Sequence, residues 1–264
     1  MDLIDFHTHI FPDSLAERAI KVLKDNSPDS KNYTDGTAAG LKKSMISAGI
    51  SRSVLLPIAT KVTQVRQINE SAVDLGNEHF IPFGTLHPDD PDFEKEIAFL
   101  VENGIKGIKL HPEYQSFYID DRRYYPIYES LAASGLVTLF HAGRDPGPFS
   151  NDHALPAAFK TLRNDFPELK LVAAHLGGFN VWNDVLEVLC GIGIWFDTAA
   201  VQGLLDPEQV EHIIKTNGTD YTLFGSDSPW FDQCEIVAWL DSLNLTMSEK
   251  EKILSKNAIR LLGV

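Results

Sequence analysis

Short apolar runs alternate with helix-like segments along the whole of this 264-residue chain. Continuous apolar runs are typical of parallel strands that are buried on both faces. Eight predicted strands, most of them such runs, lie at residues 3–10, 53–58, 80–86, 105–111, 136–141, 169–175, 192–197 and 221–227. Helix-like segments follow them at residues 14–24, 37–48, 63–76, 91–103, 122–134, 153–166, 181–190, 207–216, 235–243 and 248–262. Eight β–α units predict an α/β fold of the (β/α)8 TIM-barrel type, and an open doubly wound sheet is the alternative.

The length and composition agree with one barrel. A (β/α)8 barrel typically needs about 250 residues. Apolar residues make up 44% and charged residues 23%, the balance of a soluble globular protein with a sizeable core. Because no linker or low-complexity stretch divides the chain, we expect a single domain over residues 1–264.

Composition also excludes some partners. The formal net charge of −14 argues against nucleic-acid or acidic-membrane binding, because phosphates would be repelled. No stretch approaches the roughly 18 apolar residues of a membrane span, and the N-terminus has no signal-peptide pattern. Cys190 and Cys234 have no CxxC partner and are expected to be reduced, buried thiols. We therefore expect a cytoplasmic protein that acts on a small molecule, and a homodimer is left open.

The first strand carries a histidine pair. Residues 3–10 alternate apolar and polar side chains, which predicts that Asp5, His7 and His9 point the same way. Two imidazoles at the end of a strand can hold a divalent metal from one rigid wall, although the pair by itself is equally consistent with ordinary histidines. Asp5 is expected either to orient the second ring nitrogen of His7 or to make a simple hydrogen bond in the barrel floor.

Further reactive side chains lie at the predicted C-terminal ends of other strands. Five of the nine histidines occupy predicted strand C-termini, namely His7, His9, His111, His141 and His175. Lys109 shares a face with His111, and Asp227 ends the last strand. In a barrel these ends form one rim, which is where the active site lies. Since unpaired polar groups in a core cost stability, five histidines on one rim indicate a metal site.

The loops after the strands are expected to supply substrate contacts. Lys109 and Arg144 are natural partners for a substrate carboxylate. Further rim candidates are Tyr114, Gln115, Phe117 and Trp230, although their aromatic side chains can equally cover the barrel mouth as packing. The polar residues 25–35 are predicted to form a loop that is either a lid over the site or a surface excursion.

These motifs together resemble one family. They are Asp-Phe-His-Thr-His at the start, then Gly-Ile-Lys-Leu-His-Pro, Phe-His-Ala-Gly, Ala-His-Leu-Gly-Gly, Phe-Asp-Thr and Phe-Gly-Ser-Asp-Ser-Pro-Trp. Each is weak alone, but their order along the chain is similar to the amidohydrolase superfamily. More narrowly, they resemble its amidohydrolase-related (amidohydrolase 2) branch, which includes decarboxylases and hydratases of aromatic-derived acids. The C-terminal residues 252–262 are similar to the last helix of that branch.

The resemblance implies roles for individual residues. The positions of His7, His9, His141 and Asp227 match the metal ligands of the family. His175 matches a catalytic acid/base in decarboxylase-like members and a ligand in two-metal members. Lys109 stands where some two-metal members carry a carboxylated bridging lysine, and His111 is interpreted as facing the substrate. We expect one metal ion per chain, and the alternative is two ions with a carboxylated Lys109.

The expected chemistry follows from this ligand set. Three imidazoles and a carboxylate suit Zn²⁺, with manganese or another transition ion as an alternative. Such an ion lowers the pKa of its bound water to about 7 in favourable sites. Asp227 would take or relay the proton of that water, and His175 would polarise the substrate carbonyl or carry a proton to the leaving group.

Two enzymatic hypotheses use the same residues. The first is a metal-dependent hydrolase of a small lactone, amide or ester that carries a carboxylate, with Trp230 and His111 near the substrate. The second is a metal-dependent decarboxylase or hydratase of an aromatic-derived or unsaturated acid. The compact chain lacks an obvious large insertion of the kind that often builds a decarboxylase dimer, which favours hydrolysis. A non-catalytic binding barrel would lack a ligand, and none of the expected ligands is missing.

Overall fold

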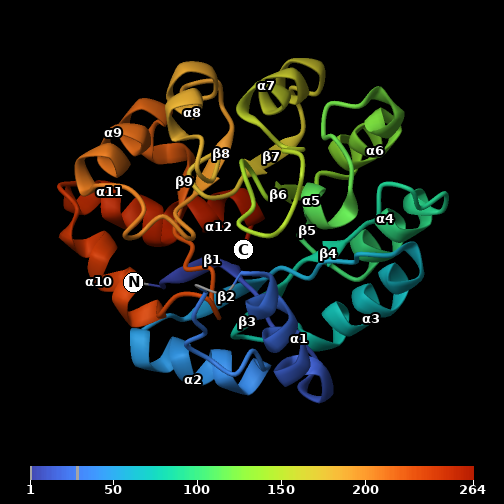
Figure 1. Cartoon of the computed structure of the whole chain (residues 1–264), viewed down its shortest axis with the longest axis horizontal. Coiled ribbons are helices and arrows are strands. Elements are labelled where there is room, and N and C mark those ends of the chain that lie inside the picture. Colours follow the sequence, from blue (N-terminus) through green and yellow to red (C-terminus); the bar gives the residue numbers. More distant parts are fainter. Residues whose placement is uncertain (1, 28–29) are drawn as a thin grey trace.

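The computed structural model describes residues 2–27 and 30–264, and it places parallel strands in the centre of a ring of helices (Figure 1). The strands are β1 (Ile4–Thr8), β2 (Arg52–Leu55), β3 (Phe80–Pro82), β4 (Gly84–Thr85), β5 (Gly107–Leu110), β6 (Val137–Phe140), β7 (Lys170–Ala173), β8 (Trp195–Asp197) and β9 (Thr222–Leu223). They pair in parallel in two runs, β1-β2-β3 and β4 to β9. The predicted TIM-barrel fold is confirmed.

Backbone hydrogen bonds join the two runs into a closed barrel. Strands β3 and β4 are two pieces of the one strand predicted at residues 80–86, interrupted at Phe83, whose N–H donates to the carbonyl of Leu55 at 2.9 Å. On the other edge, the N–H of Phe6 donates to the carbonyl of Phe224 at 2.7 Å. The barrel thus has the eight predicted strands, the third of them broken in two.

The helices lie where the sequence predicts them, with ends that differ by a few residues. They are α1 (Asp13–Asn26), α2 (Ala38–Ala48), α3 (Val65–Leu75), α4 (Phe93–Glu102), α5 (Pro112–Gln115), α6 (Tyr125–Ser134), α7 (Pro156–Asp165), α8 (Trp182–Val188), α9 (Pro207–Asn217), α10 (Gln233–Ser242), α11 (Met247–Glu251) and α12 (Asn257–Leu262). A π-helical stretch, η4 (Lys252–Lys256), joins the last two. Short 3-10 helices are η1 (Val62–Gln64), η2 (Arg122–Tyr124) and η3 (Thr219–Tyr221). Helix α5 was not predicted, because its four residues are too few to show a helical period.

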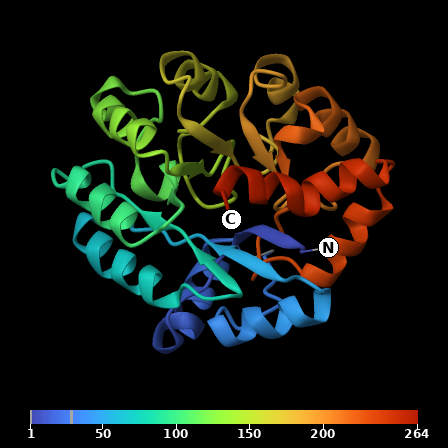
Figure 2. The same ribbon diagram turned by 180° about the vertical axis from the view of Figure 1, so that it is seen from behind.

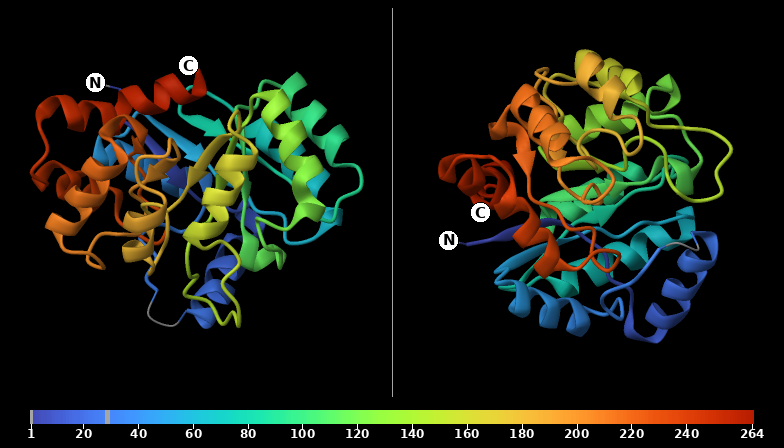
Figure 3. Two further views of the ribbon diagram at one scale, coloured as in Figure 1. Left: turned by 90° about the horizontal axis from the view of Figure 1, so that it is seen from above. Right: turned by 60° about the vertical axis from the view of Figure 1, so that its left-hand side comes forward.

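The C-terminal helix closes one end of the barrel. Strand residues such as Phe6, Leu139 and Leu223 form an inner apolar cluster that also contains Leu261 of α12. Seen from behind, α12 crosses the middle of the barrel (Figure 2). In the side view both chain ends lie at this end, while the yellow-green loop between β6 and α7 projects from the other (Figure 3, left). The C-terminal ends of the strands therefore open at the end opposite α12.

Three further expectations meet the structure here. Cys190 is half-buried but Cys234 is exposed at the start of α10, so the prediction of two buried thiols was wrong for Cys234. No helix among residues 2–27 and 30–264 is long and apolar enough to cross a membrane.

In the predicted loop 25–35, residues 28–29 lie outside the described residues, and the N–H of Tyr33 donates to the carbonyl of Pro229 at 2.7 Å. Part of this loop therefore contacts the segment that follows β9.

Candidate metal centre

Three predicted ligands converge at the open end of the barrel. His7 lies near the end of β1, His9 follows it, and Asp227 lies in the segment after β9. The two Nε2 atoms are 3.2 Å apart. Asp227 Oδ1 lies 3.5 Å from His7 Nε2 and 3.4 Å from His9 Nε2. We call His7, His9 and Asp227 the inner triad.

The hydrogen bonds on the far sides of the two rings fix their lone pairs. Nδ1 of His7 lies 2.8 Å from Asp197 Oδ2, and Nδ1 of His9 lies 2.9 Å from the carbonyl oxygen of Leu56. Both partners are acceptors, so each neutral ring carries its proton on Nδ1 and turns the lone pair of Nε2 inward. Two nitrogen lone pairs and a carboxylate oxygen thus face one another. This donor set fits a divalent transition ion, and the orientation of each imidazole by an outer acceptor is usual at such sites.

The charge states suit metal binding. Burial lowers the pKa of His7 well below its usual value, and the nearby charge of Lys109 acts in the same direction. For Asp227, burial acts to raise the pKa, but His7 and His9, in so far as they are protonated, outweigh it and lower the pKa. A neutral imidazole, as in His7, and an ionised carboxylate, as in Asp227, are the forms that bind metals.

Unusual backbone conformations position two side chains of the site. His175 and Asp227 both have left-handed backbone angles, with φ of 59° and 67°. Such angles are uncommon outside glycine and persist only where neighbours stabilise them. The N–H of Asp227 donates to the carbonyl of His7 at 2.9 Å, and the carbonyl of His175 accepts from the indole of Trp182 at 2.9 Å. Gly225 is also required, because a Cβ there would lie 2.9 Å from Cβ of His7.

Lys109 lies beside the inner triad as a buried cation. Its side chain is 1% exposed, and its Nζ is 3.5 Å from His7 Nε2. Burial lowers its pKa to about 8, against the opposing charges of Asp197 and Asp227. The ammonium form therefore predominates at neutral pH.

His175 and His141 form a second layer next to the triad. Nδ1 of His175 lies 3.0 Å from the carbonyl oxygen of Ala199, and its Nε2 lies 3.1 Å from Nδ1 of His141. The rings of His7 and His175 are neighbours, with centroids 5.1 Å apart. The structure thus places His175 in a group with His7 and Asp197, whereas His141 is grouped with His111 and Asp145. A role for His141 as a ligand of the inner ion stays a prediction.

Asp197 is a site residue to which sequence reasoning gave no role. It is fully buried at the end of β8, and burial raises its pKa. Besides orienting the ring of His7, it accepts through Oδ1 from the N–H groups of His175 and Ala199, at 2.9 and 3.1 Å. It stands at the C-terminal end of a predicted strand in Phe-Asp-Thr, and that position was the available signal.

The hypothesis that Asp5 orients the ring of His7 was wrong. The pairing of β1 with β2 shifts register between Asp5 and Thr8, which breaks the simple alternation. The carboxylate of Asp5 instead accepts from the hydroxyl of Ser226 at 2.5 Å and from the side-chain amide of Gln233 at 2.7 Å. Asp5 therefore ties β1 to the segment between β9 and α10.

The residues predicted to contact the substrate fall into two groups: some fasten loops, and others lie beside the histidines or Asp227. Gln115 donates to the carbonyls of Ala59 and Leu86 at 2.8 and 2.6 Å, and Phe117 is part of the core, so both fasten loops. Trp230 is half-buried beside Asp227, and its N–H donates to the carbonyl of that residue at 2.9 Å. Tyr114 packs edge-on against His111, with ring centroids 4.5 Å apart.

Arg144 lies farther out on the same face. Its side chain is 60% exposed and pairs with Asp152 at 3.1 Å. It lines a pocket of about 390 Å³ with Asn180, Trp182 and Gln209 among others. The residues of this pocket follow strands β6, β7 and β8, and the indole of Trp182 ties it to His175. Arg144 is therefore placed to meet only a distal part of a substrate.

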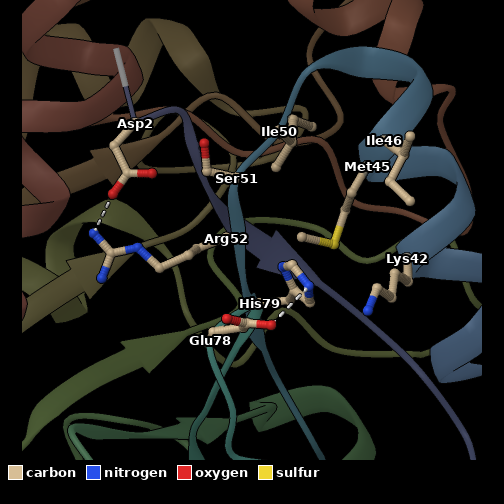
Figure 4. A pocket seen from close by; sticks show the side chains of 9 residues that line it. All are labelled: Asp2, Lys42, Met45, Ile46, Ile50, Ser51, Arg52, Glu78 and His79. Carbon is tan, nitrogen blue, oxygen red and sulfur yellow. Dashed lines mark hydrogen bonds and ion pairs between the residues drawn. The ribbon is translucent and has the colours of Figure 1, made fainter.

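A second pocket lies at the other end of the barrel (Figure 4). It measures about 350 Å³ and includes Asp2, Arg52 and His79, which precede or begin strands β1, β2 and β3. Arg52 pairs there with Asp2 at 2.8 Å. The N-terminal ends of barrel strands generally serve stability rather than catalysis. This pocket therefore has no part in the metal chemistry.

Glu113 gives a prediction for pH. It is 2% exposed in α5, accepts from the N–H of His153 at 3.0 Å, and burial raises its pKa to about 7. A carboxyl group with a raised pKa favours folding most fully below its unfolded pKa of about 4.5, and this contribution is lost as the pH rises to about 7. Both proteins are first treated with a chelator to remove any bound metal. We expect the free energy of unfolding of Glu113→Gln to equal that of the wild type near pH 5 and to exceed it at pH 8, by up to about 3 kcal/mol. Denaturant unfolding at both pH values measures this, and equal stability at pH 8 would contradict it.

Comparisons with known proteins agree with this architecture. A family model described as Amidohydrolase matches residues 4–264. No curated protein matches the sequence. Among solved structures, an uncharacterised TIM-barrel protein from Bordetella bronchiseptica is 20% identical with a TM-score of 0.79, covering 100% of this chain and 99% of its own.

Two further structures are similar to this chain in fold. A 2,6-dihydroxybenzoate decarboxylase from Rhizobium is 16% identical with a TM-score of 0.73, covering 100% of this chain and 99% of its own. A 5-carboxyvanillate decarboxylase from Novosphingobium aromaticivorans was solved with manganese and 4-hydroxy-3-methoxy-5-nitrobenzoic acid. It is 14% identical with a TM-score of 0.75, and the match covers 99% of this chain and 96% of its own. At these identities the likeness establishes the fold alone. Because the family model spans nearly the whole sequence, the chain belongs to the amidohydrolase family.

Proposed function

We propose that this protein is a metal-dependent decarboxylase of a hydroxy-substituted aromatic carboxylic acid. The observation that carries the proposal is the buried side chain of Lys109, whose Nζ lies 3.5 Å from His7 Nε2 in the inner triad. A carboxylate substrate needs such a partner, because a charged group costs free energy when it leaves water unpaired. An ester or lactone without a carboxylate has no comparable need for it, whereas one that carries a carboxylate does, so Lys109 supports an acidic substrate.

The surroundings of the site support a planar substrate. Phe179 meets His175 edge-on at 5.7 Å between ring centroids, and it also contacts Trp182. On the other side, Tyr114 packs between His111 and Phe149, with centroid distances of 4.5 and 5.1 Å. Aromatic side chains thus flank the histidines on both sides. They offer faces and edges against which an aromatic ring can pack.

The similar structures weigh in the same direction. Two of them carry the names of decarboxylases that act on 2,6-dihydroxybenzoate and 5-carboxyvanillate. Their alignments extend over at least 96% of each chain, so the compactness of this protein no longer favours hydrolysis. Hydrolysis of a small carbonyl compound remains the alternative that the experiment below must separate.

The residues can carry the reaction as follows. His7, His9 and Asp227 would hold the ion, which would supply Lewis acidity to the substrate. Zn²⁺ suits this donor set, and the manganese in the Novosphingobium enzyme makes Mn²⁺ the second ion to test. Lys109 pairs with the substrate carboxylate. His175 gives a proton to the ring carbon that bears the carboxyl group, the bond between that carbon and the carboxyl group breaks, and CO₂ leaves.

A panel assay tests the proposal. Protein loaded separately with Zn²⁺ and Mn²⁺ is incubated with 2,6-dihydroxybenzoate, 5-carboxyvanillate and related hydroxybenzoates, and CO₂ release is measured. A parallel panel holds lactones, esters and amides of similar size. We expect CO₂ from at least one acid and none from Asp227→Asn. Turnover of a panel ester, lactone or amide with no CO₂ from any acid would overturn the decarboxylase proposal.

A further inference from the structure

The two carboxylate oxygens of Asp197 bind different partners. The side chain is fully buried at the end of β8. Oδ2 lies 2.8 Å from Nδ1 of His7, while Oδ1 accepts from the backbone N–H groups of His175 and Ala199 at 2.9 and 3.1 Å. One carboxylate thus contacts both the histidine of β1 and the turn that carries His175.

Asp197 also holds the backbone of the turn after β7. His175 and Leu176 both have left-handed backbone angles, with φ of 59° and 51°, which persist only where neighbours stabilise them. The N–H of Leu176 donates to the main-chain carbonyl of Asp197 at 2.7 Å. Ala199, whose N–H is held by the carboxylate, places its own carbonyl 3.0 Å from Nδ1 of His175. The contacts of Asp197 therefore support the backbone of His175 directly and its ring through Ala199.

The two oxygens are not interchangeable. Oδ1 faces two backbone N–H groups, which can only donate. Oδ2 faces a ring nitrogen of His7, which donates or accepts according to the tautomer. Because an ionised carboxylate only accepts, it selects the tautomer of His7 that carries the proton on Nδ1 and leaves the lone pair of Nε2 for an ion.

We propose that Asp197 is a positioning residue that sets the metal-binding tautomer of His7 and the placement of His175 together. The acceptor for the ligand imidazole and the support of the neighbouring histidine are one buried group. The effect on turnover rests on the proposed function, in which His175 gives the proton. The tautomer of His7 and the affinity for zinc do not depend on the reaction.

Replacing Asp197 by asparagine separates the two roles. The amide oxygen is expected to occupy the place of Oδ1, because the two backbone N–H groups there need an acceptor. The amide NH₂ group then faces Nδ1 of His7, and two donors cannot form a hydrogen bond with each other. The proton of His7 therefore moves to Nε2, and the lone pair that faces Asp227 is lost.

Side-chain NMR measures the tautomer directly. Metal-free protein with ¹⁵N-labelled histidine is measured at pH 8, where ordinary imidazoles are neutral, and the His7 signal is assigned by its absence in His7→Gln. We expect the proton of His7 on Nδ1 in the wild type and on Nε2 in Asp197→Asn. His9 is the internal control, because its Nδ1 faces the carbonyl of Leu56 in both proteins. A wild type with the proton of His7 on Nε2, or an unchanged tautomer in the folded variant, overturns the proposal.

Zinc affinity gives a second measurement. Titration of metal-free protein against a zinc-binding dye should show an affinity about 10- to 100-fold lower in Asp197→Asn than in the wild type. The matched control is Glu113→Gln, another carboxyl-to-amide change at a buried position, beside His111 and His153, and it should keep the wild-type affinity. Equal affinity in Asp197→Asn overturns the proposal. A wild type that binds no zinc contradicts the metal centre itself, and the tautomer measurement still tests Asp197.

Amide exchange tests the support of His175. The N–H groups of His175 and Ala199 should exchange slowly in the wild type and in Asp197→Asn, because an oxygen accepts from both. In Asp197→Ala they lose this acceptor and should exchange at least about 10-fold faster. The N–H of Ala174, which donates to the carbonyl of Phe140 at 3.0 Å, is the control and should keep its rate. Fast exchange in the wild type, or an unchanged rate in folded Asp197→Ala, overturns the link to His175.

Discussion

Replacing Asp227 by asparagine is expected to empty the inner triad and to abolish most of the activity. The amide keeps the shape of the side chain but removes the negative charge that faces His7 and His9 at 3.5 and 3.4 Å. Two neutral imidazoles then hold a divalent ion without a charged ligand, and metal affinity falls steeply. We expect turnover of the substrate found in the panel to drop by roughly 10³-fold or more, which corresponds to about 4 kcal/mol of activation free energy.

The metal content gives the direct measurement. After chelator stripping and reloading with Zn²⁺, elemental analysis should show about one ion per chain fewer in the Asp227→Asn variant than in the wild type. Asp241→Asn is a suitable control, because that carboxylate is 77% exposed on α10 and away from the triad. Full metal retention by the Asp227 variant would remove this residue from the site.

Replacing His175 by asparagine should leave the inner ion in place and still reduce kcat, by about 10² to 10⁴-fold. His175 is not one of the three residues of the inner triad, although it is grouped with His7 and Asp197, and its Nε2 lies 3.1 Å from Nδ1 of His141. The expected loss therefore reflects proton transfer. The pH profile of kcat should lose the limb that depends on an imidazole, while elemental analysis shows unchanged metal.

The matched control for that variant is His212→Asn, an exposed histidine on α9. It should keep wild-type kcat, pH profile and metal content. If His175→Asn instead loses the inner ion, His175 is a ligand, and the two-metal arrangement with a carboxylated Lys109 becomes the better description. Unchanged kcat would exclude His175 as the proton donor.

The sequence predicted much of the site because a parallel barrel converts strand order into position. Continuous apolar runs indicate strands buried on both faces, and eight of them with intervening helices leave few folds available. All C-terminal strand ends then meet on one rim, so His7, His9 and Asp227 could be grouped before any distance was known. Local motifs alone could not have joined residues more than 200 positions apart.

Other residues could not be assigned because their roles depend on register and on side-chain partners. Simple alternation places the carboxylate of Asp5 under His7, but in the folded chain it accepts from Ser226, and β1 shifts register against β2 between Asp5 and Thr8. Asp197 orients the ring of His7 instead, across 190 positions of sequence. Nothing in the local pattern marks that contact.

The sequence by itself thus determined the barrel, its reactive rim and the residue types suited to a divalent ion. Only the tertiary structure decided which ring nitrogens face which acceptors. It turned the lone pairs of His7 and His9 toward Asp227. The physical reason is that a ring tautomer is set by the acceptor on its far side, and for His7 and His175 the folded chain brings that acceptor from another strand end.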